Sequence, residues 1–265
     1  SRRQFGVTID TFPAIRELLC DMSVDVQAAR VLTYYCSKCV DLENGLTRKF
    51  ERLKGTPEAA EVRPRMKRYA ALNKMLTPFA KYFASEMSMS NANGAIAILG
   101  GSGFMKDYPV ERNLRDSRIT TIYEGTSQLQ VVAAVAGVTG GLVRDAVQDI
   151  LEGVTLTDSL RAKLDEINKL NDELDAAVAG VKANPEAKIV HDLAARKLVD
   201  AGVAVVVAAL FVRLAAVLGA DKELALDHWI AQRFPRVRAD LARATSGYMG
   251  SVAAFERLAP AIPVE

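Results

Sequence analysis

Residues 115–130 read RDSRITTIYEGTSQLQ, and the rest of the chain is organised around this stretch. Within it, Glu124 follows the apolar pair Ile122 and Tyr123 and precedes Gly125, a residue type that permits close backbone approach. Apolar neighbours raise the pKa of a carboxyl group by disfavouring its charged form, which brings a proton acceptor toward the working pH. The pattern therefore makes Glu124 a candidate general base.

The residues just after Glu124 leave a second interpretation open. Thr126 and Gln128 add neutral hydrogen-bonding groups, and an apolar helix is expected to begin near Thr126. A glutamate at this position is also typical of a loop residue that caps the following helix. Spacing alone does not separate a catalytic carboxylate from a capping one.

Composition restricts the class of protein. The chain has 265 residues, half of them hydrophobic, which is enough for one large or two ordinary domains with a real core. A formal charge of +2 argues against nucleic acid as a partner. Cys36 and Cys39 fit a buried helical face rather than a disulfide framework or a zinc site, so we expect no metal and a reduced, cytoplasmic setting.

Apolar residues recur at spacings of three and four, and no strand-like alternation is visible, so the chain is predicted to be all-α. One long helix is expected from Phe12 to about Leu42 and a second from Met66 toward Asn93. The polar stretch between them, Glu43 to Pro64, predicts a long connection that could carry a short helix. Two antiparallel helices of this kind begin a bundle.

The glycine-rich stretch 100–103 matches neither dinucleotide-loop nor phosphate-loop spacing, and it follows a helix rather than a strand. It is therefore either a plain helix-ending turn or a place where the chain approaches something closely. Pro109 fits the first turn of a short helix that ends near Ser117.

A composition shift after Gly140 and Gly141 marks the expected domain boundary. Beyond it we expect an amphipathic helix over 160–181, a helix from a capping Asn184 to Gly219, and a last helix from Asp221 that Pro235 breaks or kinks. The apolar run 201–212 is too short to span a bilayer and predicts a buried helix, so membrane association is disfavoured. We expect this extension to pack on the first bundle or on a second copy, giving at least a homodimer.

Three motifs in order give the chain a family resemblance. These are residues 2–6 (RRQFG), residues 100–116 with their GGSGF and YPVERNLRD segments, and residues 123–130 (YEGTSQLQ). Together they resemble the C-terminal helical domain of the acyl-CoA dehydrogenases. The resemblance covers about residues 1–140 and implies an up-and-down four-helix bundle, followed by a second, bundle-like helical extension over 141–265.

The resemblance also implies a chemistry. In the family, the glutamate matching Glu124 removes the α-proton of an acyl-CoA thioester while the β-hydrogen leaves as hydride to FAD, giving trans-2-enoyl-CoA. Electrons then pass to an electron-transfer flavoprotein, as in fatty-acid β-oxidation, and the enzymes are homodimers or homotetramers. The residues carried over are Thr126 and Gln128 for FAD in the same subunit, Arg2, Gln4, Phe5, Gly100 and Gly101 for the FAD of a neighbouring subunit, and Tyr123 and Gly125 for the substrate.

Some features depart from the family pattern. Ala97 stands where many members have Gln, and Gly94 where an acidic residue is frequent, so a flavin hydrogen bond is expected to be missing. The chain lacks an initiator Met and begins inside a motif, so we expect an excised domain that is inactive alone. The alternatives are a helical assembly module without activity, and a related acyl-CoA oxidase or flavin monooxygenase.

Overall fold

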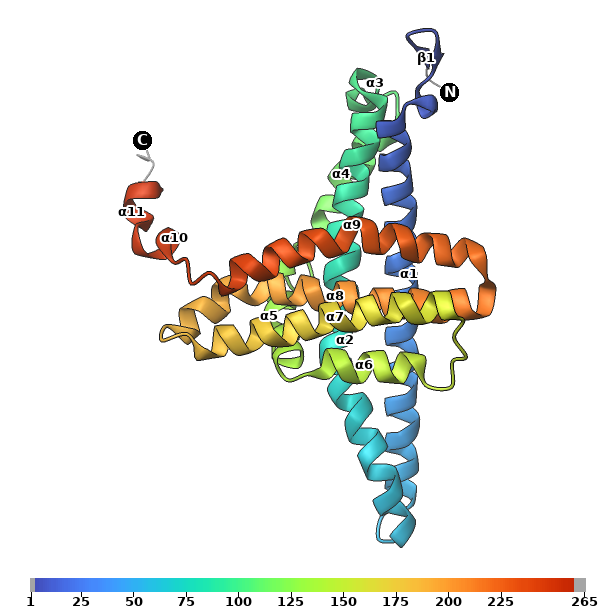
Figure 1. Ribbon diagram of the computed structural model, residues 1–265, viewed down its shortest axis with the longest axis vertical. Coiled ribbons are helices and arrows are strands. Elements are labelled where there is room, and N and C mark those ends of the chain that lie inside the picture. Colours follow the sequence, from blue (N-terminus) through green and yellow to red (C-terminus); the bar gives the residue numbers. More distant parts are fainter. Residues whose placement is uncertain (1–2, 260–265) are drawn as a thin grey trace.

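A long antiparallel pair of helices forms the axis of the molecule (Figure 1). The computed structural model describes residues 3–259. Helix α1 spans Pro13–Arg52 and α2 spans Pro57–Leu99. Both begin with a proline at the first helical position, where the missing N–H costs nothing and the fixed φ favours the helix. The all-α prediction is confirmed, apart from a two-stranded ribbon of β1 (Arg3–Gln4) and β2 (Val7–Thr8) before the short 3₁₀ helix Ile9–Thr11.

The predicted long connection over Glu43 to Pro64 is wrong. Only residues 53–56 separate α1 from α2, and α2 continues through Pro64 and Pro78. In the α2 part of this stretch, only Ala59 and Val62 are buried. The polar composition therefore belongs to two helical ends that project into solvent, not to a loop.

Three shorter helices return the chain along α2. They are α3 (Gly101–Phe104), α4 (Pro109–Thr120) and α5 (Ser127–Thr139). Gly100 ends α2 with a φ of 58°, a conformation that glycine adopts readily, so the glycine-rich stretch serves as a helix-ending turn. The expected short helix from Pro109 is confirmed and extends to Thr120.

The C-terminal helices lie across the long pair (Figure 1). They are α6 (Leu142–Leu151), α7 (Asp158–Ala183), α8 (Ala187–Leu218) and α9 (Ala220–Thr245), followed by the single-turn helices α10 (Gly250–Ala253) and α11 (Phe255–Leu258). Asn184 does not cap α8: it ends α7, and its side-chain oxygen accepts from the Glu186 amide at 2.9 Å, so α8 starts at Ala187. Helix α9 runs through Pro235 without a break.

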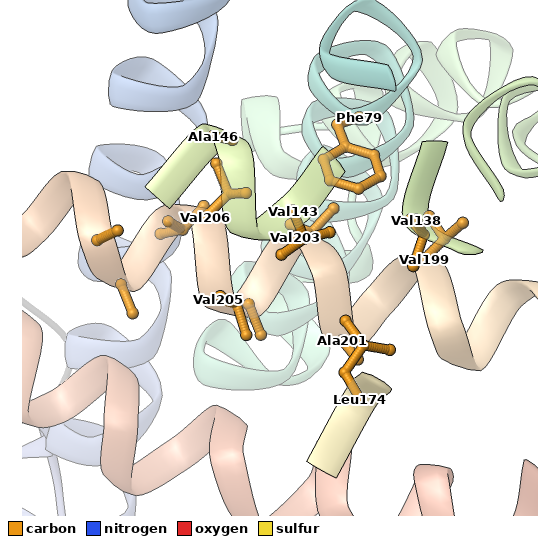
Figure 2. Packing of buried hydrophobic residues seen from close by; sticks show 14 of the residues in the cluster. Phe79, Val138, Val143, Ala146, Leu174, Val199, Ala201, Val203, Val205 and Val206 are labelled. Atoms are coloured by element: carbon orange, nitrogen blue, oxygen red, sulfur yellow. The ribbon is translucent and has the colours of Figure 1, made fainter. Parts of the chain in front are cut away.

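Helix α8 lies in the middle of one continuous core. All twelve residues from 201 to 212 are buried, as predicted. Figure 2 shows three residues of α8 beside residues of the neighbouring helices: Val199 beside Val138 of α5, Val203 near Phe79 of α2, and Val206 beside Ala146 of α6. The extension therefore docks on the first helices, and residues from both sides of the turn at 140–141 share the same core.

Helix α8 is also the one described helix long and apolar enough to cross a membrane. The bent pair α5 and α6 would pass the same test only if both helices formed a single span. In α8, 72% of the most apolar 18-residue segment is buried among the other helices. Such burial is typical of a core helix.

Candidate active site

A six-residue loop between α4 and α5 carries Glu124, and both of its ends are fixed. Thr121, directly after α4, is buried, while Thr126, directly before α5, caps that helix by accepting a hydrogen bond from the Leu129 amide at 3.3 Å. The Ser127 amide donates to the Thr121 carbonyl at 3.0 Å and closes the loop. The predicted helix start near Thr126 is confirmed, and the side chain that caps it belongs to Thr126 rather than Glu124.

Glu124 adopts an unusual backbone conformation. Its φ is 52°, and that of Gly125 is 91°, so two consecutive residues lie in the left-handed region. For a residue with a Cβ this conformation costs about 1–2 kcal/mol. It therefore persists only where neighbouring contacts hold it, and such strained residues are frequent at functional sites.

Two side chains hold the strained pair through its carbonyl groups. Lys81 on α2 donates to the Thr120 carbonyl at 2.6 Å and to the Gly125 carbonyl at 3.0 Å. Gln130 on α5 donates to the Glu124 carbonyl at 3.2 Å. The peptide groups that follow Glu124 and Gly125 are thus anchored from two different helices.

The Glu124 side chain is exposed, contrary to the expectation of an apolar environment. The left-handed turn directs this part of the loop outward, so its apolar sequence neighbours Ile122 and Tyr123 are also about half exposed, at 46% and 49%. Leu129 beside them is exposed as well. This chain presents a carboxylate on an apolar surface, and among residues 3–259 nothing covers it.

The predicted cofactor residues fall into two groups. Thr126 and Gln128 lie at the start of α5, next to Glu124, and both are exposed. Gln4, Phe5, Gly100 and Gly101 belong to the β1–β2 ribbon and the α2–α3 turn, which lie together at one end of the long helix pair (Figure 1). Arg2 lies outside the described residues. Within one chain the two groups are separate, as expected if the second serves a neighbouring subunit.

The donors around Thr126 fit the anionic end of a dinucleotide. Because the Thr126 hydroxyl oxygen already accepts from Leu129, its own O–H remains able to donate. Gln128, next to Thr126 at the start of α5, is exposed and carries a side-chain amide that can donate, and a helix N-terminus favours negative charge. Two positions in α2 depart from the family pattern. Ala97 is exposed, and a Cβ added at Gly94 would lie 3.5 Å from the Met22 sulfur.

Sequence reasoning missed Lys81 and Gln130. Lys81 lies in the apolar stretch 75–83 of α2, and a lysine placed among buried residues is a signal that could have been followed. Its partners, however, are 39 and 44 residues away in sequence, so no local pattern identifies them. Gln130 lies inside the motif of residues 123–130, but its hydrogen bond to the Glu124 carbonyl is not evident from the sequence.

The fold and this loop define a helical domain that presents one carboxylate on a rigid turn. Residues 1–138, just over half of the chain, match the family described as "Acyl-CoA dehydrogenase, C-terminal domain". The chain therefore belongs to the acyl-CoA dehydrogenase family, and the resemblance identified from its motifs is confirmed.

Curated relatives match the first half of the chain. It is 34% identical over 131 residues to the probable acyl-CoA dehydrogenase FadE25 of Mycobacterium tuberculosis, and those residues are 49% of this chain and 27% of the relative. It is 35% identical over 129 residues to CarC, a subunit of the caffeyl-CoA reductase-Etf complex of Acetobacterium woodii, with the same coverage. The matched region thus spans about a quarter of the length of these relatives.

Two solved structures share the fold over nearly the whole chain. Caenorhabditis elegans ACDH-11, in complex with C11-CoA, aligns with a TM-score of 0.69 and 19% identity over 94% of this chain and 42% of its own. A Bacillus anthracis acyl-CoA dehydrogenase complexed with FAD aligns with a TM-score of 0.66 and 20% identity, over 100% of this chain and 48% of the neighbour's chain. The likeness of fold therefore extends past residue 138 into the C-terminal helices.

Proposed function

We propose that this chain forms the C-terminal part of an FAD-dependent acyl-CoA dehydrogenase in which Glu124 is the catalytic base. The observation that carries the proposal is the placement of Glu124: one carboxylate, on a strained loop that is anchored on both sides, facing outward among apolar side chains. Family membership supports this assignment. The parts of the enzyme that this chain does not span would supply the cover over the loop.

In this proposal, the Glu124 carboxylate takes the α-proton of an acyl-CoA thioester, and the product is the trans-2-enoyl-CoA. A base performs this step well when it is positioned beside the α-carbon and shielded from water. Tyr123 and Gly125 flank the carboxylate and would line the acyl chain. Tyr123 is exposed and Gly125 is half-buried, so Tyr123 in particular is free to contact a substrate.

Bound FAD would supply the acceptor for the β-hydrogen, which leaves as hydride. Thr126 and Gln128 would hold the phosphate and adenosine end, since both are exposed donors at the start of α5. Gln4, Phe5 and the Gly100–Gly101 turn would contact the FAD of a neighbouring subunit, which makes the active enzyme a homodimer or homotetramer. The proposed electron acceptor is an electron-transfer flavoprotein, and a cytoplasmic location is proposed with it.

The test is Glu124→Gln in the complete enzyme, meaning this chain together with the parts that its relatives carry and it does not span. The amide keeps the shape of the side chain but is not basic, so we expect dehydrogenation to fall by about 10²–10⁴-fold. FAD content and thermal unfolding should stay unchanged, because the carboxylate contacts none of the described residues by hydrogen bond. Glu61→Gln, at an exposed position on α2, is the matched control. Activity above about 1% of wild type would exclude Glu124 as the base.

A further inference from the structure

We propose that Lys81 is a positioning residue that holds the Glu124 loop in its reactive conformation. The inference rests on the proposed function of Glu124 and adds a residue on another helix to the same site. Lys81 touches the backbone of the loop rather than the carboxylate. Its role would therefore be exerted through the loop.

The contacts of Lys81 lie on both sides of Glu124. Its ammonium group donates to Thr120, the last residue of α4, and to Gly125, directly after the base. It also lies 5.5 Å from the centre of the Tyr123 ring, which is within cation–π range. One side chain thus joins the end of α4, the residue before Glu124 and the residue after it.

The chemistry of lysine suits this arrangement. The final carbonyls of a helix have no partner within the helix and carry partial negative charge, so a cation there is stabilising. An ammonium group has three donors and can satisfy several carbonyls that point at it from different directions. Because Lys81 is half-buried on α2, it holds the loop against a helix that is itself fixed in the core.

For a general base such as Glu124, the rate depends strongly on where the carboxylate lies relative to the α-carbon of the substrate. The hydrogen bonds from Lys81 and Gln130 fix the two peptide groups that follow Glu124 and Gly125, and these set the direction of the Glu124 side chain. A displacement of about 1 Å at a reacting group can reduce the rate about 10²-fold. If Lys81 no longer holds the turn, the strained φ of Glu124 has lost one of its two anchors.

The test compares Lys81→Met, Lys81→Arg and the control Lys74→Met, an exposed lysine on the same helix, in the complete enzyme. Lys81→Met keeps the apolar stem without the donors, and we expect kcat to fall about 10- to 100-fold with KM changed much less. Deuterium at the substrate α-carbon should then slow the reaction more than in wild type, because proton removal limits turnover. Lys81→Arg, which restores cationic donors, should recover part of kcat, and Lys74→Met should resemble wild type.

Hydrogen exchange of the loop gives a readout that does not depend on activity. Amides of residues 121–127 should exchange faster in Lys81→Met, while those of α8 should be unchanged. Unaltered kcat per folded enzyme together with unaltered loop exchange would overturn the proposal, and so would a lower melting temperature without loss of kcat. An active Glu124→Gln enzyme would instead overturn the proposed function, and the exchange result would still decide whether Lys81 holds the loop.

Discussion

Helix α8 and the Glu124 loop are fixed in opposite ways. Residues 201–212 of α8 are held by apolar packing on all sides and include no charged group. The loop 121–126 is largely exposed and is held by a small number of hydrogen bonds from Lys81, Gln130 and Ser127. The comparison indicates that the extension supplies stability, while the reactive group sits where few contacts set its geometry.

This difference separates the two kinds of mutational effect. Substitutions in α8 should lower stability first and activity only through loss of folded protein. Substitutions around Glu124 should lower activity while the protein stays folded. Buried Asp149 and half-buried Asp200 join helices of the extension to α1 and α2, so substitutions at these two carboxylates should change stability less than overpacking of the α8 core.

The largest effect is expected from Gly202→Leu. A Cβ at this glycine would lie 2.9 Å from Phe79 Cζ and 3.2 Å from Val143 Cγ2, and these neighbours are themselves buried. Overpacking of this kind should lower the free energy of unfolding by at least about 3 kcal/mol in urea titrations. Gly180→Ala is the control: its Cβ meets only Thr245 at 3.4 Å, so it should stabilise by about 0.5–1 kcal/mol. Equal free energies of unfolding for Gly202→Leu and Gly180→Ala would contradict the role of α8 packing in stability.

A smaller loss of stability is expected from Asp149→Ala. Asp149 on α6 is buried and accepts from Tyr35 at 3.0 Å and from Tyr69 at 2.8 Å, which ties α6 to α1 and α2. Without it, two buried hydroxyl groups lose their acceptor, and unfolding titrations should show a loss of about 2–4 kcal/mol. Tyr69→Phe removes one of these bonds and should cost about 1 kcal/mol. A change in Asp149→Ala no larger than in Tyr69→Phe would contradict this interpretation.

The smallest effect, and the one that depends on pH, concerns Asp200 on α8. Burial raises the pKa of Asp200 to about 6, although a hydrogen bond from Tyr82 at 2.8 Å and the nearby Arg196 favour the charged form. The pKa of an aspartate in an unfolded chain is about 4, so the folded protein binds this proton more tightly. The charged carboxylate therefore lowers stability above about pH 6, and this penalty disappears as the pH falls toward about 4.

Asp200→Asn keeps an acceptor for Tyr82 and cannot ionise. It should be more stable than wild type by about 1–3 kcal/mol at pH 8, and the difference should vanish near pH 4. Melting curves between these pH values check the prediction. Asp192→Asn, at an exposed site on the same helix, should show no such trend. A pH-independent difference for Asp200→Asn would contradict the assigned shift.

The sequence predicted those features that depend on local chemistry. Proline at position 109 and the apolar stretch that follows Thr126 marked helix starts, although the cap of α5 is Thr126 and not Glu124, and the apolar run 201–212 marked the buried helix. The extent of α1 and α2 was missed because exposed helix and loop share a polar composition. Lys81 donates hydrogen bonds to the loop, and Glu124 has a left-handed φ, because segments distant in sequence meet there. Periodicity does not encode such contacts.

The projecting tip of the long helix pair has a practical consequence. Residues 53–56 lie at the far end of α1 and α2, away from the crossing helices and from α4 and α5, which flank the Glu124 loop (Figure 1). Exposed turns with few buried contacts tolerate inserted sequence and are the first places that proteases cut. A fluorescent label or affinity tag inserted after Lys54 would therefore report on the protein while leaving the candidate active site untouched.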